Sequence, residues 1–249
     1  MEKKLVAFTI ADSENMKYAD MMTKSLRKFH TAEELPLVVI GPEELKTRLI
    51  DPFFFYRATP IIASELFDKG YETVIKIDSD SIICGDISAS WTNKSVDASV
   101  VLNSNPREWK NFQYTIWDIP PFQYLNCGFV SMRNKAMVEH WRTLCMGPHF
   151  VPYQMKEQDL LNIICQYGDY LVNLLDSSNG LWGLSGKGYF QDMVVRKNKL
   201  WLDPQPDGYP RATCQVKIIH FAGGNEPNKC NYKIRFRPEV VKFIDKLVK

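Results

Sequence analysis

The chain has 249 residues, of which 45% are hydrophobic and 24% are charged, as expected for a globular protein large enough to bury a core. Lysine and arginine total 31 against 29 acidic residues, and a net charge of +2 argues against general attraction to nucleic acid or an anionic membrane. The six cysteines include no C-x-x-C pair, so we expect reduced, structural thiols rather than a zinc ribbon. No apolar run suits a signal sequence or a membrane span, which predicts a cytoplasmic protein.

The first hundred residues alternate between apolar strands and amphipathic helices. Apolar side chains recur with helical spacing from Tyr18 to Phe29, whereas the strand candidates are continuous apolar runs. We expect strands over residues 4–10, 35–41 and 74–77, and helices over residues 18–29, 42–50 and 56–70. Gly70 is placed to end the last of these helices. This alternation predicts an α/β fold with a mostly parallel sheet covered on both faces.

The rest of the chain is less regular. We expect strands over residues 97–102, 127–132 and 216–220, and helices over residues 134–145 and 156–167. Residues 103–124 and 176–212 are long, aromatic and irregular, and such segments on an α/β scaffold more often form functional walls than linkers. Because no interdomain linker stands out, we predict a single domain.

Two aspartates, Asp78 and Asp80, directly follow the third predicted strand and are separated by Ser79. Ligands of open α/β sheets bind beyond the carboxyl ends of the strands, and side chains two residues apart in an extended segment point the same way. The two carboxylates would therefore converge and repel each other unless a cation lies between them. Mg²⁺ or Mn²⁺, with substrate phosphates in its shell, would remove that repulsion. An aspartate pair can also cap a solvated loop, and this pattern alone leaves both interpretations open.

A second strand end favours the metal hypothesis. The apolar run that ends at His220 is followed by Gly223 and Gly224, and Lys229 lies nearby in the sequence. An imidazole at a strand end can be a third metal ligand, and glycines let backbone N–H groups approach a phosphate. A lone histidine is usually a core or loop residue, but a histidine, glycines and a lysine together indicate a metal and phosphate site.

Several short motifs occur in a fixed order along the chain. After the N-terminal strand come Arg57 on the third helix, the D-S-D motif at 78–80, "YLNCGFVSM" at 124–132, "KEQDLLN" at 156–162 and "HFAGG" at 220–224. In this order the chain resembles the metal-dependent glycosyltransferases of the GT-A fold, especially family 8, which includes glycogenin and bacterial galactosyltransferases, with some likeness to family 34. The resemblance implies a Rossmann-like, mostly parallel mixed sheet flanked by helices, with a nucleotide-binding half at 1–102 and an acceptor-binding half at 103–249.

The resemblance also implies roles for individual residues. Asp78, Asp80 and His220 would bind the metal, and Gln158 or Asp159 would lie nearest the reacting carbon, with Glu157 beside them. The residues that would contact the donor are Phe8, Ile10, Ala11, Arg57, Asp78, Ser79, Asn126, Gly128, Gly223 and Lys229. Phe8 and Ile10 could equally be strand core. Lys229 lies further from the histidine than the family's lysine does, which puts its contact with phosphate in doubt.

These residues imply a transferase with Mn²⁺ or Mg²⁺ as its cofactor. It would move a hexose or pentose from a nucleoside diphosphate sugar, expected to be a UDP-sugar, to a glycan or to a lipid- or protein-linked sugar, with retention of configuration. The metal would neutralise the negative charge that grows on the leaving diphosphate. Sugars stack on aromatic side chains, and the candidates in the irregular segments are Trp109, Trp117, Trp182 and Trp201. We expect no nucleic acid partner.

Two other classes of function remain open from the sequence. Haloacid-dehalogenase-type phosphatases also place a D-x-D motif at a strand end, but normally at the first strand of the core, whereas here it follows the third. A nucleotide-sugar or glycan-binding module that has lost turnover would keep the same fold. The intact Asp78, Asp80 and His220 argue against this second alternative.

Overall fold

The computed structural model describes residues 4–48, 54–102, 119–120, 123–150, 155–175, 184–185, 190–206, 212–221 and 231–249. The strands are β1 (Leu5–Ile10), β2 (Leu37–Ile40), β3 (Thr73–Ile77), β4 (Ser81–Ile83), β5 (Ala98–Leu102), β6 (Leu125–Met132), β7 (Val172–Leu175), β8 (Leu184–Ser185), β9 (Met193–Arg196), β10 (Lys199–Leu202), β11 (Cys214–Gln215) and β12 (Ile218–His220). The helices are α1 (Met16–Arg27), α2 (Pro42–Arg48), α3 (Phe54–Asp68), α4 (Ala89–Thr92), α5 (Lys135–Met146), the 3₁₀ helix η3 (Pro148–Phe150), α6 (Glu157–Tyr167), α7 (Tyr232–Arg235) and α8 (Pro238–Val248).

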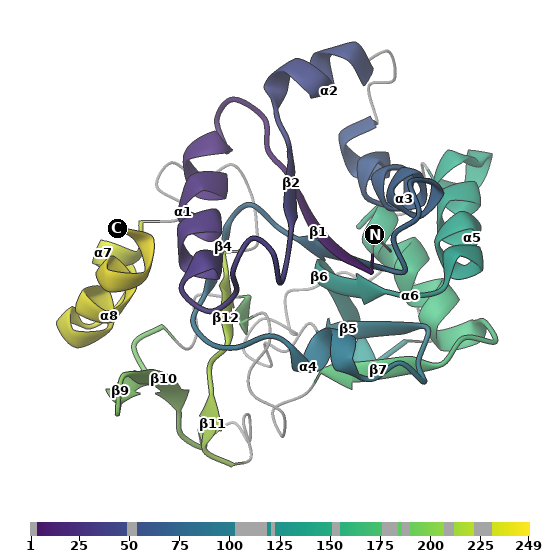
Figure 1. Ribbon diagram of the computed structural model, residues 1–249. Coiled ribbons are helices and arrows are strands. Elements are labelled where there is room, and N and C mark those ends of the chain that lie inside the picture. Colours follow the sequence, from purple (N-terminus) through teal and green to yellow (C-terminus); the bar gives the residue numbers. More distant parts are fainter. Residues whose placement is uncertain are drawn as a thin grey trace.

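A six-stranded sheet forms the centre of the molecule, with the order β2-β1-β3-β6-β5-β7 (Figure 1). Strands β1, β2 and β3 are mutually parallel, and β5 is parallel to β7. Strand β6 is antiparallel to both of its neighbours, β3 and β5. The sequence prediction of a mostly parallel mixed sheet is therefore confirmed.

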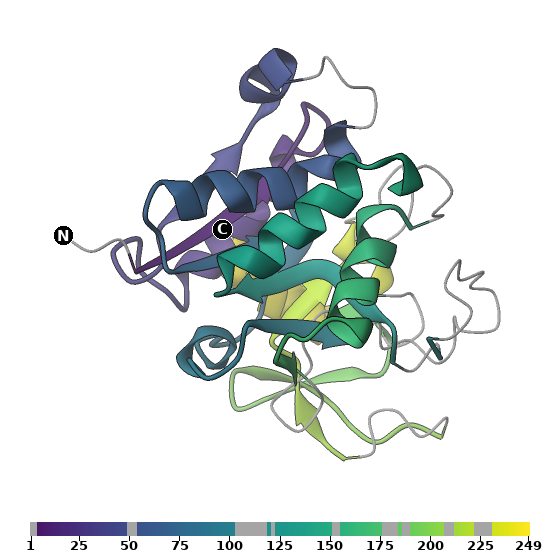
Figure 2. The same ribbon diagram turned by 90° about the vertical axis from the view of Figure 1, so that its right-hand side faces the viewer.

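Helices cover both faces of this sheet. Helices α3, α5 and α6 pack on one face, and Figure 2 shows α3 and α5 side by side across it. Helix α1 covers the other face through Met22 and Leu26, which pack against Ile75 and Ile77 of β3. Because side chains alternate along a strand, Lys76 points to the opposite face from these isoleucines. The side chain of Lys76 on β3 therefore points towards α6.

The end of helix α3 illustrates how the local sequence sets a boundary. The helix stops at Asp68, and Gly70 adopts a positive φ of 90°, a conformation that glycine adopts without steric cost. The N–H of Gly70 donates to the carbonyl of Phe67 and satisfies one of the last helical acceptors. The prediction that Gly70 ends this helix is confirmed.

Two small sheets lie beside the central one. One has the order β4-β12-β8, with β12 antiparallel to β4 and parallel to β8, and the other is the antiparallel sheet β11-β10-β9. Helix α8 packs on α1 and on β9 (Figure 1). The pairing of β12 with β4 joins the C-terminal part of the chain to the segment that follows β3. This pairing assembles the site described below.

Two further expectations concern membrane-spanning helices and the state of the cysteines. None of the described helices combines the length and the apolar character needed to cross a membrane. The five cysteines in the described residues are Cys84, Cys127, Cys145, Cys165 and Cys214, and all are free thiols. Cys230 lies outside the described residues.

Candidate metal and donor site

Asp78, Asp80 and His220 form a cluster at the carboxyl end of β3. The chain turns after Ile77 and starts β4 at Ser81, and the antiparallel register places His220 directly opposite Ser81. The imidazole Nε2 lies 3.0 Å from Oδ2 of Asp78 and 3.2 Å from Oδ1 of Asp80. One ligand atom from each residue falls within 4.8 Å of the other two. The structure therefore brings together the three predicted metal ligands, although about 140 residues separate His220 from Asp80.

Backbone hydrogen bonds fix the turn that carries the two aspartates. The N–H of Asp78 donates to the carbonyl of Gly128 at 2.8 Å, which ties the turn to β6. On the other side, the N–H of Phe221 donates to the carbonyl of Asp80 at 3.0 Å, just after β12 ends. The two aspartates are thus held between β6 and β12.

The glycine at position 128 leaves room for the imidazole. A Cβ atom on Gly128 would lie 2.3 Å from Cε1 and 2.5 Å from Nδ1 of His220, and 2.7 Å from Oδ1 of Asn126. All three distances are below 3.0 Å, which real Cβ atoms essentially never show. A side chain at position 128 would therefore displace His220 or Asn126.

The charges in the cluster compensate one another. Burial alone would lower the pKa of His220, but the carboxylates of Asp80 and Asp78 raise it to about 9. Burial alone would raise the pKa of Asp78, but Lys76 and His220 hold it below its ordinary value. Lys76 keeps its charge as well, because Asp78 outweighs the effect of burial and raises the pKa of the lysine. The metal-free cluster thus holds two carboxylates against two cationic side chains.

These donor atoms suit a hard divalent cation. Two carboxylates and one imidazole form an oxygen and nitrogen set of the kind that binds Mn²⁺ or Mg²⁺, and no cysteine thiolate takes part. The carboxylates of Asp80 and Asp78 are 9% and 32% exposed, so both can reach a ligand from the solvent side. Among the described residues, Nδ1 of His220 has no hydrogen-bond partner. The cluster therefore fits the predicted metal.

The start of helix α6 packs against the start of β6 and forms a wall next to the cluster. Oε1 of Gln158 accepts from the N–H of Cys127 at 3.0 Å, and the Gln158 side chain is buried. Oδ1 of Asn126 accepts from the N–H of Gly128 at 2.7 Å. Burial raises the pKa of Glu157 to about 8, although Lys76 nearby opposes this shift. The wall thus presents an amide nitrogen and an acid that carries a proton near neutral pH.

Asp159 differs from Glu157 and Gln158 in the hydrogen bonds that it accepts. It is fully buried, and its carboxylate oxygens accept from the hydroxyl of Tyr124 at 2.6 Å and from the N–H of Met155 at 2.8 Å. Asn162 lies one turn further along α6 and bonds to both the N–H and the carbonyl of Leu125. Neither Asn162 nor Tyr124 was predicted as a site residue. Both serve to hold α6 against β6.

Five of the residues predicted to contact the donor fall into two groups. Phe8 and Ala11 are fully buried, and Phe8 belongs to the core on the α3 side of the sheet, which favours the strand-core interpretation for that residue. Ile10 is half-buried at the end of β1, and Ser79 lies in the aspartate turn. The guanidinium of Arg57 lies 4.7 Å from the ring centroid of Phe150. Ile10, Ser79 and Arg57 therefore remain candidates for contact with a donor.

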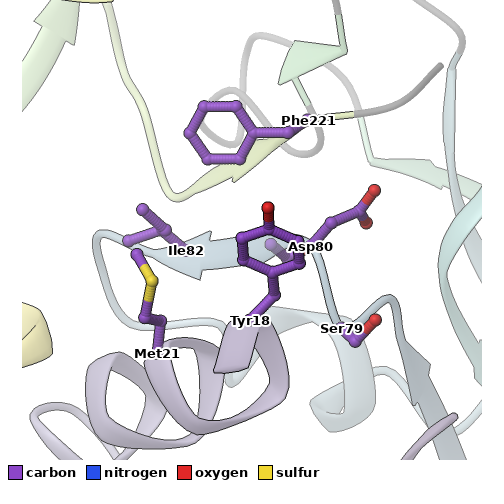
Figure 3. A pocket seen from close by; sticks show the side chains of 7 residues that line it. Tyr18, Met21, Ser79, Asp80, Ile82 and Phe221 are labelled. Atoms are coloured by element: carbon purple, nitrogen blue, oxygen red, sulfur yellow. The ribbon is translucent and has the colours of Figure 1, made fainter. Parts of the chain in front are cut away.

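A small hollow adjoins the aspartate turn on its α1 side (Figure 3). Tyr18 and Met21 project from α1 into it, Phe221 faces them from the end of β12, and Asp80 and Ile82 lie between. Tyr18 therefore lies near the cluster.

Some predicted positions lie outside the described residues. These are Gly223, Gly224, Lys229, Trp109, Trp117 and Trp182, together with most of the two segments expected to bind the acceptor. Trp201 is described, and its indole N–H donates to the carbonyl of Arg196 in the β9–β10 hairpin.

Comparisons with known proteins give the fold. No family model matches the chain, and no curated protein matches it in sequence. Among solved structures, all of this chain aligns with 52% of the bifunctional glycosyltransferase WbbM, at a TM-score of 0.59 and 13% identity. It is also similar to the galactosyltransferase LgtC in complex with donor and acceptor sugar analogues (TM-score 0.57, 14% identity, 98% of this chain and 97% of LgtC). Mouse xyloside xylosyltransferase 1 gives a TM-score of 0.54 at 14% identity, over 92% of this chain and 99% of the enzyme. Since identities this low establish the fold alone, the comparisons show that the chain has the GT-A fold of these glycosyltransferases.

Proposed function

We propose that the protein is a metal-dependent glycosyltransferase that moves a hexose or pentose from a nucleoside diphosphate sugar, most simply a UDP-sugar, to a hydroxyl of a glycan or other acceptor. One observation carries this proposal. Asp78, Asp80 and His220 converge at the carboxyl end of β3, where open α/β sheets bind their ligands, in a chain with the GT-A fold. The solved structures with this fold named above are glycosyltransferases, which supports the same conclusion.

The chemistry of glycosyl transfer explains why the cluster would be needed. When the bond between the anomeric carbon and the diphosphate breaks, negative charge grows on the leaving phosphate. A Mn²⁺ or Mg²⁺ ion held by Asp78, Asp80 and His220 would stabilise that charge. The backbone links from Asp78 to Gly128 and from Phe221 to Asp80 keep the ligands in place before the donor arrives, so little reorganisation is required.

We assign the wall formed by β6 and α6 to the transferred sugar. Gln158 offers a buried side-chain amide at this end of the sheet, and a sugar hydroxyl or ring oxygen could accept from its nitrogen. Asn126 and Glu157 lie beside it at the same end of the sheet and would contact further hydroxyl groups. Asp159 would hold α6 in place rather than contact the sugar, because both of its carboxylate oxygens already accept hydrogen bonds.

A wall of this kind is compatible with retention of configuration. An inverting enzyme requires a carboxylate base at the acceptor hydroxyl. Glu157 is raised in pKa by burial and would be largely protonated near neutral pH, and Asp159 is engaged, so neither suits that role. We therefore propose a retaining enzyme with Gln158 nearest the reacting carbon.

The nucleotide would lie between the end of β1 and the aspartate turn. Ile10 and Ser79 stand at this edge, and Arg57 on α3 provides a positive charge for the diphosphate or the sugar. Gly223 and Lys229 are assigned to the phosphates from their positions after β12. The halves 1–102 and 103–249 would then bind nucleotide and acceptor, with His220 of the second half completing the metal site.

A thermal-shift experiment tests the proposal directly. The purified chain is melted with a panel of nucleoside diphosphates and nucleotide sugars, with Mn²⁺ or with a chelator, and the best donor is then assayed for slow hydrolysis. We expect Mn²⁺-dependent stabilisation by one nucleotide, and its loss in Asp80→Asn. Asp86→Asn serves as the matched control because Asp86 lies on an exposed loop of the same segment outside the cluster. No stabilisation by any nucleotide would refute the donor site, whereas stabilisation without hydrolysis or transfer would indicate a binding module.

A further inference from the structure

A buried lysine lies directly beneath the proposed metal site. Lys76 is 4% exposed and sits in the middle of β3, paired in register with Phe8 of β1 and Val130 of β6. A strand buried on both faces is normally apolar throughout, and an ammonium in such a position is costly unless it is paired. The nature of its partners therefore indicates what this lysine does.

The ammonium of Lys76 has two identified partners, and both belong to the site. It forms an ion pair with Oδ1 of Asp78 and donates a hydrogen bond to the carbonyl of Cys127 at 2.7 Å. Lys76 and Asp78 point to the same face of the strand because they are two residues apart. The lysine thus occupies one oxygen of a predicted metal ligand from the protein side.

The other oxygen of Asp78 faces His220. Nε2 of His220 lies 3.0 Å from Oδ2 of Asp78 and 3.2 Å from Oδ1 of Asp80. A cation that enters the cluster would bind between these atoms, at the oxygen of Asp78 that faces His220. It would not displace Lys76, since the lysine approaches Asp78 from the buried side. One of the two aspartates therefore stays compensated by a protein charge when a cation is bound.

We propose that Lys76 is a positioning residue that competes with the cation for Asp78 and keeps the affinity of the nucleotide-free protein for a divalent cation low. With Lys76 present, the cation is opposed by a fixed positive charge and gains a single oxygen of Asp78. Asp80 supplies the second carboxylate of the set, beside His220. This second step rests on the proposed function: the phosphates of a nucleoside diphosphate would supply the missing negative charge, so that cation and nucleotide bind together.

Manganese binding to the full-length chain without nucleotide tests the role of Lys76. Free Mn²⁺ is followed by its electron paramagnetic resonance signal during titration of the wild type, Lys76→Met, Lys76→Gln and Lys76→Arg. Methionine matches the length of lysine, and glutamine keeps a donor for the Cys127 carbonyl if the methionine variant does not fold. Arginine keeps the charge. Circular dichroism verifies the fold of each variant.

We expect the uncharged variants to bind Mn²⁺ at least about tenfold more tightly than the wild type, since a fixed positive charge beside the cation has been removed. Lys76→Arg should stay close to the wild type. A lysine that served only the fold would give the opposite sign, because its loss would disorder Asp78 and weaken binding. Unchanged or weaker Mn²⁺ binding in the uncharged variants therefore overturns the proposal.

A second titration separates this inference from the proposed function. When a nucleoside diphosphate is added, the wild type should bind Mn²⁺ more tightly, and Lys76→Met should show a smaller gain. If the uncharged variants bind Mn²⁺ tightly without nucleotide but no nucleotide changes Mn²⁺ binding in the wild type, the role of Lys76 stands and the donor site is refuted.

Discussion

Replacing Gly128 by alanine tests whether the geometry of the cluster, rather than its composition, creates the metal site. The added Cβ would lie 2.3 Å from Cε1 of His220, and an ordinary contact begins at 3.4 Å, so the imidazole or the backbone must move by about 1.1 Å. The substitution leaves Asp78, Asp80 and His220 chemically intact. Any change in metal binding must then come from position.

The size of the effect follows from how strictly metals hold their ligands. A ligand distance within about 0.2 Å of its ideal value is the normal tolerance, and the required movement exceeds it several-fold. Losing an outer partner of a metal ligand already costs about 10–100-fold in affinity, so displacing the ligand itself should cost about 100-fold or more. The crowding should also destabilise the fold by about 1–3 kcal/mol, as overpacking of a buried site usually does.

The assay is Mn²⁺ titration by calorimetry, combined with urea unfolding of the metal-free protein. Gly41→Ala is the matched control, because a Cβ at that position would meet only Met16 Sδ, at 3.9 Å, and should leave both quantities unchanged. If Gly128→Ala binds Mn²⁺ like the wild type while it remains folded, His220 is not a ligand in the position described, and the reasoning fails.

Two further predictions concern protons. At pH 7.5 His220 should carry a proton in the metal-free protein, since Asp80 and Asp78 raise its pKa to about 9 against the opposing effect of burial. Mn²⁺ binding should then release about one proton, seen as a dependence of the calorimetric enthalpy on the buffer's ionisation enthalpy; no such dependence would contradict ligation by His220. Glu157 has a folded-state pKa raised by burial to about 8, so the folded protein holds a proton that the unfolded chain loses near 4.5. Stability should therefore fall as the pH rises from about 4.5 to 8. Glu157→Gln should reduce this fall in urea unfolding curves recorded across that range, and an unchanged pH dependence would contradict the assignment.

Apolar patterns predicted five of the six strands of the central sheet, and the edge strand β7 was not predicted. Helices α1, α3, α5 and α6 lie within a few residues of their predicted ranges, because each buries a stripe of apolar side chains against the sheet. Helix α8 was not predicted, although Val240, Phe243, Ile244 and Leu247 repeat at helical spacing and are buried. The helical spacing is therefore visible in the sequence, but it lies in a part of the chain where strands and helices no longer alternate regularly.

The convergence of the metal cluster could be predicted in part. A D-x-D motif after an apolar strand fixes two carboxylates at a known edge of the sheet, and this inference requires only the two-residue period of a strand. The position of His220 required more, because it depends on the pairing of β12 with β4, and short strands of three residues leave little trace in the sequence. The resemblance to a family supplied that link, and the structure places His220 where it was expected.

Lys76 is a residue whose burial and partners the sequence pattern does not reveal. It stands in the apolar strand before Asp78, yet a single lysine in a strand is typical of an edge or surface position, and nothing local reveals that it is 4% exposed. The observation that matters is where its two partners lie: Asp78 follows the same strand, and the carbonyl of Cys127 belongs to the neighbouring strand β6. A cluster of Asp78, Asp80 and His220 without this lysine would carry a different charge and bind a cation differently. The sequence motif therefore predicts the ligands, whereas in our proposal the affinity of the site depends on a residue outside the motif.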